Sequence, residues 1–214
     1  MGPELWQVIA LSLVVSGVAI VVSMVLGVPV GIFLGLHRFP GRQLLVTLVN
    51  TGMGLPPVVV GLVVFLLLAR AGPLGSLELL YTPTAMILAQ VVIAWPLVVG
   101  VTLAAIQGLD ARLRLQILSL GASPSQLYWK LVREARLSLV AALAAGFGSI
   151  ISEVGAVMMV GGNIRGETRV MTTAIVLETR QGNFGLAIAL SVVLLLIALG
   201  VNWLFTWVQQ RGRV

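Results

Sequence analysis

The feature that most constrains this chain is the length of its uncharged apolar runs. No charged residue lies between Glu4 and His37, a stretch of 32 positions. A helix crosses the hydrocarbon core of a bilayer with about 20 residues, so this stretch is longer than one straight crossing requires. The 214-residue chain is 59% hydrophobic and 9% charged, whereas soluble domains carry about 25% charged residues. The sequence therefore predicts an integral membrane protein.

Four further apolar runs follow, and each is long enough to form a membrane helix. Pro29 predicts a bend in the first run, and Pro96 lies near the middle of the third. The segment from Gly52 to Pro57 interrupts the second run, and Glu153 is the single carboxylate in the fourth. We expect an all-α polytopic protein with about five transmembrane helices, forming one transmembrane domain over residues 1–214. The expected spans cover residues 5–36, about 44–69, 82–107, 137–160 and 184–208.

The basic residues occupy the short segments between these runs. With five spans the termini lie on opposite sides of the membrane, and 9 of the 13 basic residues share the side of the C-terminus. The positive-inside rule then predicts that the N-terminus is outside and the C-terminus is cytoplasmic. Because these signals account for the net charge of +6, we expect no nucleic-acid partner. The cytoplasmic set is Arg38, Arg42, Arg112, Arg114, Lys130, Arg133, Arg136, Arg211 and Arg213, and the outer set is Arg70, Arg165, Arg169 and Arg180.

Catalytic and metal-binding residues are scarce in this sequence. There is no cysteine, and His37 is the only histidine, so disulfides, thiolate sites and imidazole clusters are excluded. No Gly-x-x-x-x-Gly-Lys loop is present to hold a nucleotide phosphate. We therefore expect no metal, no cofactor and no enzymatic activity in this chain.

A polar, amphipathic segment over about residues 110–136 stands out from the apolar runs. Gly121 fits the left-handed position that closes a helix. Ser123 fits the N-cap of a second helix, with Pro124 at its first position and Gln126 completing a capping box. The sequence thus predicts two short helices joined by a tight elbow. The apolar residues that share a helical face are Leu113, Ile117 and Leu120 in the first helix and Leu127 and Leu131 in the second.

The elbow Leu120-Gly-Ala-Ser-Pro124 resembles the coupling loop of ABC importer permeases, although Leu115, Gln116 and Ile117 stand where that family has Glu-Ala-Ala. In that family the elbow docks into a groove of a cytoplasmic ATPase and transmits its closure. An interfacial loop without a partner is the alternative. The resemblance assigns ATPase coupling to Leu120, Gly121, Ala122, Ser123, Pro124 and Gln126.

The resemblance extends along the chain. The segments Gly54-Leu-Pro-Pro57, Ser152-Glu153 and Gly161-Gly-Asn163 are similar to the molybdate/tungstate branch of oxyanion importers, and most similar to tungstate permeases. This resemblance implies an ABC type I importer permease fold in the inner (plasma) membrane. It further implies a homodimer with ATPase subunits and an extracytoplasmic substrate-binding protein, importing tungstate by alternating access. Molybdate or sulfate transport, or an autonomous ion-coupled carrier or channel, are the alternatives.

Candidate pathway residues lie at two places. Gly54, Pro56 and Pro57 break helical hydrogen bonding, which is tolerated at membrane depth where backbone is buried in protein or lines a cavity. A kink that only fits the packing is the alternative. Ser149 and Glu153 lie on an expected small-residue helix face with Ala142 and Gly146. Because a carboxylate repels an anionic substrate, we favour a structural or gating contact for Glu153, with a role in selectivity as the alternative. Arg165 and Arg169 have three alternative roles: they attract an anion, they contact a binding protein, or they are solvated loop charges.

Overall fold

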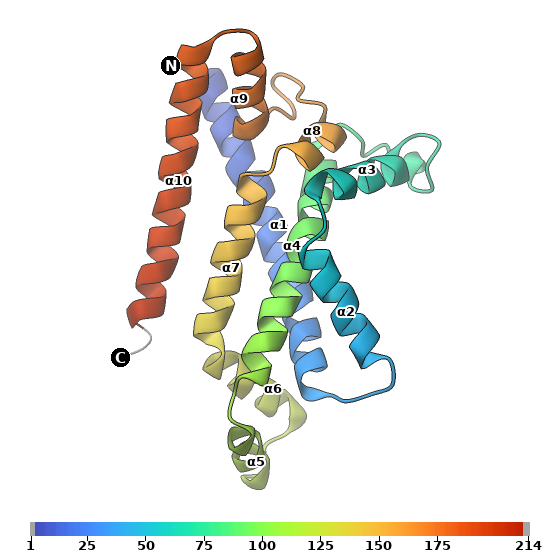
Figure 1. Cartoon of the computed structure of the whole chain (residues 1–214), viewed down its shortest axis with the longest axis vertical. Coiled ribbons are helices and arrows are strands. Elements are labelled where there is room, and N and C mark those ends of the chain that lie inside the picture. The colour runs from blue at the N-terminus through green and yellow to red at the C-terminus, as the bar shows by residue number, and fades with distance from the viewer. Residues whose placement is uncertain (1–2, 212–214) are drawn as a thin grey trace.

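The computed structural model describes residues 3–211, and every regular element in that range is a helix (Figure 1). The elements in chain order are α1 (Pro3–Leu36), α2 (Arg42–Met53), α3 (Pro57–Leu68), the 3-10 turn η1 (Gly75–Leu77), α4 (Pro83–Gln107), α5 (Ala111–Ser119), α6 (Pro124–Glu134), α7 (Arg136–Ile151), α8 (Gly155–Gly161), α9 (Met171–Arg180) and α10 (Phe184–Arg211).

Helix α4 is the centre of the bundle, because it packs against α1, α2, α3, α7 and α8. Its closest partner is α1, and the contact uses glycines of α1. A Cβ atom at Gly31 would lie 2.6 Å from Cβ of Thr102, and one at Gly35 would lie 2.7 Å from Cγ2 of Ile106. Small residues let membrane helices approach closely enough for backbone-to-side-chain packing.

Within residues 3–211, three helices are long and apolar enough to cross a membrane, namely Glu4–Leu36, Pro83–Gln107 and Phe184–Gln210. The count reaches five if two bent helix pairs each form one span. Pro29 and Pro96 both lie inside continuous helices. The second expected span is not straight: α2 and α3 meet at 105°.

The fourth expected span, over residues 137–160, is wrong as a single helix. Helix α7 stops at Ile151, and residues 152–154 separate it from α8. The Ser152 hydroxyl donates to the carbonyl oxygens of Gly148 and Ser149, at 2.9 and 3.1 Å. Serine side chains that bond to nearby backbone compete with regular helical bonding, which favours a break here.

The segment between the fourth and fifth expected spans, residues 161–183, contains a helix, α9, that the sequence pattern did not indicate. Met171 and Ala174 of α9 are buried against Val8 of α1 and Leu190 of α10. This apolar contact stabilises a short helix that would be marginal alone. Glu178 and Arg180 therefore lie on a helix and not in a loop.

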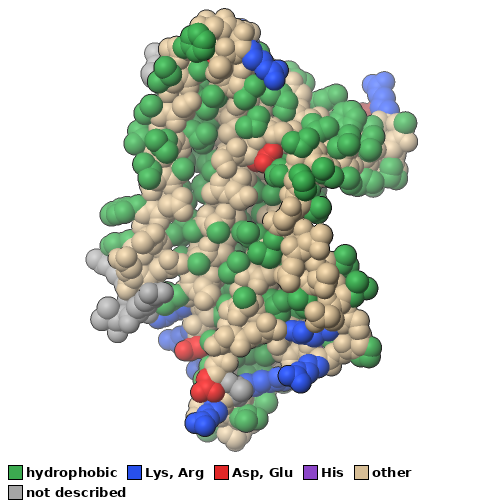
Figure 2. All heavy atoms as spheres, in the orientation of Figure 1, with side chains coloured by type: hydrophobic (Ala, Val, Ile, Leu, Met, Phe, Trp, Pro, Cys, Tyr) green, Lys and Arg blue, Asp and Glu red, His purple; other side chains and the backbone are tan. Residues whose placement is uncertain are grey.

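The two ends of the bundle carry different elements (Figure 1). At one end α5 and α6 lie beside the C-terminal end of α1, because Arg114 Nη1 donates to the carbonyl oxygen of Leu36 at 3.1 Å. Gln209 Nε2 donates to the carbonyl oxygen of Leu137 at 3.2 Å, which brings the end of α10 there as well. Helix α9 and the start of α1 form the opposite end. Figure 2 shows charged side chains gathered at the lower end, below a largely uncharged shaft. Arg213 lies outside the described residues.

Candidate functional site

A groove of about 270 Å³ opens where the chain turns between α2 and α3. Gly54, Pro56 and Pro57, which we predicted to open the backbone, line this groove, and Ser149 of α7 faces it. No charged side chain is among its lining residues within the part of the chain that the structure describes. The structure thus brings four of the five candidate pathway residues together. The other lining residues are Gly52, Met53, Leu55, Val60, Ile93, Ala94 and Leu97.

The turn itself follows from its two prolines. Pro56 adopts an extended conformation with φ −61° and ψ 123°, and Pro57 is the first residue of α3. A proline cannot donate a backbone hydrogen bond, and it disfavours helical geometry in the residue before it. Helix α2 therefore cannot continue into α3, and Gly54 N instead donates to the carbonyl oxygen of Thr51 at 3.0 Å.

Close packing holds the end of α2 against α4. A Cβ atom at Gly52 would lie 2.9 Å from Cβ of Pro96. A Cβ atom at Gly100 would lie 2.5 Å from Sδ of Met53. Glycine at these two positions therefore permits the approach that forms one wall of the groove.

The fifth candidate, Glu153, does not line the groove. It is half-buried in the linker between α7 and α8. Its Oε1 accepts a hydrogen bond from the Ala156 amide at 3.0 Å, and its carbonyl oxygen accepts one from the Thr172 hydroxyl of α9 at 2.9 Å. The amides of a first helical turn lack partners within the helix, so a carboxylate is favourable there. Within residues 3–211 no arginine forms an ion pair with Glu153.

The expected small-residue face does not extend to Glu153, because α7 ends before it. Ala142 and Gly146 are buried, and a Cβ atom at Gly146 would lie 2.6 Å from Cδ1 of Ile20 in α1. Ser149 is exposed and belongs to the groove. The face is therefore a helix contact in its first half and a groove wall in its second.

The elbow between α5 and α6 has the predicted local geometry. Gly121 is left-handed with φ +77°. Ser123 Oγ accepts from the Gln126 amide at 3.4 Å, and Gln126 Oε1 accepts from the Ser123 amide at 2.8 Å. Pro124 occupies the first position of α6. The predicted capping box is confirmed.

Helix α6 is attached to the bundle along one face. Leu127 and Leu131 are buried in a cluster with Ile32 of α1 and Ile106 of α4. The prediction that Leu120 shares the apolar face of α5 is wrong, because its side chain is 86% exposed. Leu120 follows the last residue of α5 and points away from the bundle because the chain has already begun to turn. Ala122 lies at the elbow between Gly121 and the Ser123 cap.

At the opposite end, Glu4 joins the start of α1 to the segment between α8 and α9. Arg165 donates to both carboxylate oxygens of Glu4 through Nε and Nη2. Arg169 Nη1 lies 4.0 Å from Glu4 Oε1. Arg165 and Arg169, for which we predicted an anion, a binding protein or solvent as the partner, thus both lie near the carboxylate of Glu4 in the same chain.

Sequence reasoning missed the polar contacts that attach α9. Ser12 Oγ accepts from the Met171 amide at 2.8 Å, and Thr168 Oγ1 donates to the carbonyl oxygen of Gly161. Ser12, Ser16 and Ser23 lie on one helical face of an otherwise apolar run, and all three are buried. That spacing was a readable signal. The ion pair between Glu4 and Arg165 spans 161 positions and leaves no local pattern.

Known membrane transport proteins are similar to this chain in sequence. The chain is 46% identical over 210 residues to a probable anion ABC transporter permease protein of Haloferax volcanii, covering 96% of this chain and 90% of the relative. It is 39% identical over 209 residues to the tungstate uptake system permease protein TupB of Peptoclostridium acidaminophilum, covering 98% of this chain and 92% of that protein.

A solved structure shares the fold. An inward-facing conformation of the MetNI methionine ABC transporter matches with a TM-score of 0.76 over 99% of both chains, at 18% identity. The expected ABC type I importer permease fold is thereby confirmed. The family described as binding-protein-dependent transport system inner membrane component matches residues 27–214. The chain therefore belongs to this family of inner membrane transport components.

Proposed function

We propose that this chain is the permease subunit of an ATP-driven importer that moves an oxyanion, tungstate, into the cytoplasm by alternating access. The observation that carries the proposal is the capped elbow between α5 and α6, which projects from one end of the bundle (Figure 1). The relative named as a tungstate uptake permease supports the substrate.

The elbow is the docking point for a separate ATPase subunit. Leu120 is exposed at the elbow, while Leu127 and Leu131 connect α6 to α1 and α4. A push on the elbow is thus passed to the central helices. Residues 110–136 form the cytoplasmic coupling loop, and Leu120, Gly121, Ala122, Ser123, Pro124 and Gln126 are its coupling residues.

A second copy of the chain completes the pathway. The groove beside α3 is open on a single chain, and the outer face of α3 exposes Val59, Leu62, Val63 and Leu66. A twofold-related copy facing the groove would close it. A substrate-binding protein then delivers the anion at the end that carries α9.

The groove holds the anion weakly. Burying a dianion without countercharge is severely unfavourable, and the groove offers glycine backbone, proline and the Ser149 hydroxyl instead of basic side chains. The binding protein therefore supplies most of the discrimination. Glu153 stabilises the start of α8 and contributes to gating through that contact. An autonomous carrier would place ionisable residues along its pathway.

Two glycines provide a matched test of the elbow. Gly121 at φ +77° and Gly41 at φ +86° both have open space where a Cβ would lie. Valine at either position meets the same left-handed strain of about 1–2 kcal/mol. We expect Gly121→Val to abolish ATP-driven uptake while Gly41→Val retains it. Equal uptake by the two variants would show that the elbow does not couple.

The transport assay uses the complete complex in vesicles. We expect tungstate uptake only when ATP and the binding protein are both present, and no tight tungstate binding to the purified permease alone. Nanomolar binding by the permease, or uptake without ATP, would overturn the mechanism. A strict preference for molybdate or sulfate would overturn the substrate while leaving the importer class intact.

Cysteine labelling tests the orientation, because the chain contains no cysteine. Gly166→Cys should react with a membrane-impermeant thiol reagent in intact cells, and Ser125→Cys should not. The opposite pattern would place the elbow outside the cell and exclude a cytoplasmic ATPase as its partner.

A further inference from the structure

A basic niche of about 370 Å³ lies where α6 meets α7. Lys130, Arg133 and Glu134 of α6 line it, together with Arg136 and Leu137 of α7. Three cations against one carboxylate leave the lining with a net charge of +2. Four of the five niche residues lie in the coupling loop over residues 110–136, but none is among the coupling residues at the elbow or the residues that line the groove.

The three cations of the niche are not neutralised within the described part of the chain. The ion pairs found there all involve Glu4, so Glu134 pairs with none of Lys130, Arg133 and Arg136. All three cationic residues are exposed. Like charges one helical turn apart are mutually destabilising. Arg136 also opens α7, where a positive charge is unfavourable for the helix dipole. A bound anion would relieve both costs.

The niche lies beside an exposed apolar surface on α10. Gln209 of α10 donates to the carbonyl oxygen of Leu137, so the end of α10 lies against the niche. Earlier in α10, Leu195, Leu199 and Trp203 are 57–70% exposed. Only 11% of the apolar stretch of α10 is buried inside the protein. This helix therefore presents a long apolar surface to the bilayer.

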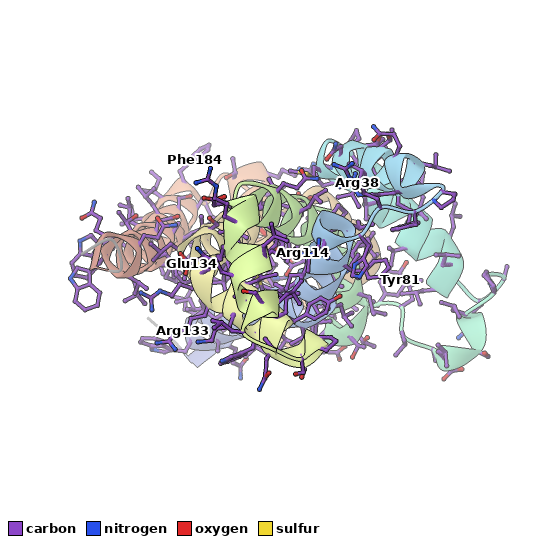
Figure 3. The ribbon with its side chains drawn as sticks, turned by 90° about the horizontal axis from the view of Figure 1, so that it is seen from below. Arg38, Tyr81, Arg114, Arg133, Glu134 and Phe184 are labelled. Carbon is purple, nitrogen blue, oxygen red and sulfur yellow. The ribbon has the colours of Figure 1, made fainter. Side chains whose placement is uncertain are left out.

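Two exposed tryptophans indicate that the niche lies at the level of the lipid headgroups. Trp129 lies one turn before Arg133 on α6 and is 69% exposed, and Trp203 of α10 is 70% exposed. Exposed tryptophans gather at the boundary between hydrocarbon and headgroups. Figure 3 shows Arg133 and Glu134 on the side of α6 toward α10, with Arg38 and Arg114 on the other side.

We propose that the niche binds the phosphate headgroup of an anionic phospholipid whose acyl chains lie along α10. Basic pockets between membrane helices at the headgroup level recognise such lipids. Lys130 and Arg133 lie four and seven residues after Gln126 on α6, about 6 and 10 Å along the helix axis. The exposed apolar surface of α10 beside the niche favours a lipid over the ATPase that docks at the elbow.

The test measures lipid binding to the purified full-length chain by native mass spectrometry. The probes are phosphatidylglycerol and phosphatidylcholine with identical acyl chains. We expect the wild type to prefer phosphatidylglycerol. The double variant Arg133→Gln/Arg136→Gln should bind phosphatidylglycerol roughly 30-fold more weakly, from about 1 kcal/mol for each cation removed. Its affinity for phosphatidylcholine should not change.

The matched control is Arg70→Gln/Arg180→Gln, which removes the same charge away from the niche and should keep the preference. Both double variants should have the thermal unfolding midpoint of the wild type, because the replaced side chains are exposed. Equal binding of the two lipids by the wild type would overturn the proposal. Complete displacement of phosphatidylglycerol by excess inorganic phosphate would assign the niche to free phosphate instead. A niche variant that keeps the preference but no longer copurifies with its ATPase would assign it to protein docking.

Discussion

The chain turns sharply at two places that both contain glycine and proline, and the two turns are held by different means. The elbow between α5 and α6 is fixed by residues within a few positions of one another, through Gly121 and the capping box of Ser123 and Gln126. Between α2 and α3 the prolines end the first helix, but the direction that the chain then takes is fixed by distant residues. A Cβ atom at Gly61 of α3 would lie 2.5 Å from Cα of Ala156 in α8.

This difference separates a movable element from a fixed one. The elbow is exposed and keeps its shape through local bonds, so it can move as a unit, and the buried Leu127 and Leu131 connect it to α1 and α4. The groove at the second turn has its shape only while α3 remains packed on α8, and α8 in turn is anchored by Glu153 and α9. Local bonding suits the coupling role that we propose for the elbow, and tertiary packing suits a wall that must hold its position.

Gly61→Ala should have the largest effect, because its Cβ would meet backbone of α8 that cannot move aside. Overpacking of this kind costs about 1–3 kcal/mol. We expect a lower thermal unfolding midpoint in detergent. The control is Gly148→Ala in α7, where the Cβ enters open space. That change should stabilise the helix by up to about 1 kcal/mol. Equal midpoints would contradict a tertiary origin for the second turn.

Glu153→Ala should be the next most harmful change. It leaves the Ala156 amide without its carboxylate partner, at a cost of about 1–3 kcal/mol for a buried unpaired donor. Glu153→Gln keeps an acceptor oxygen and should retain partial uptake and most of the stability. The measurements are the unfolding midpoint and the uptake rate in vesicles. If the glutamine variant instead changes which oxyanion is carried, Glu153 belongs to the selectivity pathway.

Ser123→Ala should act locally. Loss of the N-cap costs about 1 kcal/mol, and the effect should appear as faster hydrogen exchange at the Gln126 amide, which donates to Ser123 Oγ. The bundle should unfold at nearly the wild-type temperature. Ser138→Ala, an exposed serine in α7, provides the control and should leave exchange in α6 unchanged. A large drop in the unfolding midpoint would mean that the elbow is part of the core.

Pro57→Ala should have the smallest effect. Pro57 restricts the conformations of the unfolded chain. Replacing it by alanine raises the entropy of the unfolded state and lowers the free energy of unfolding by about 0.4–1 kcal/mol. Because the packing of α3 on α8 holds the turn, the groove should persist. Uptake by the complete transporter should remain near the wild-type rate. Loss of uptake at normal stability would show that the local proline signal, and not packing, shapes the groove.

The sequence by itself determined the membrane class, the long helices α1, α4 and α10, and the elbow. Each depends on residues close together in the chain. Apolar runs decide burial in lipid, and the cap of α6 joins residues three positions apart. The interruption near Pro56 and Pro57 was also readable, because two successive prolines remove two adjacent backbone donors and the second disfavours helical geometry in the first. A single proline is tolerated inside a helix, as at Pro29 and Pro96.

Only the tertiary structure decided where the broken pieces go. The 105° angle between α2 and α3, the separate helix α8, the short helix α9 and the pairing of Glu4 with Arg165 all depend on partners far away in sequence. A local pattern states that a helix ends, but the direction in which the chain continues is set by the surfaces available to bury it. That is why Ser149 joined the groove while Glu153, four residues later, became an anchor for α8.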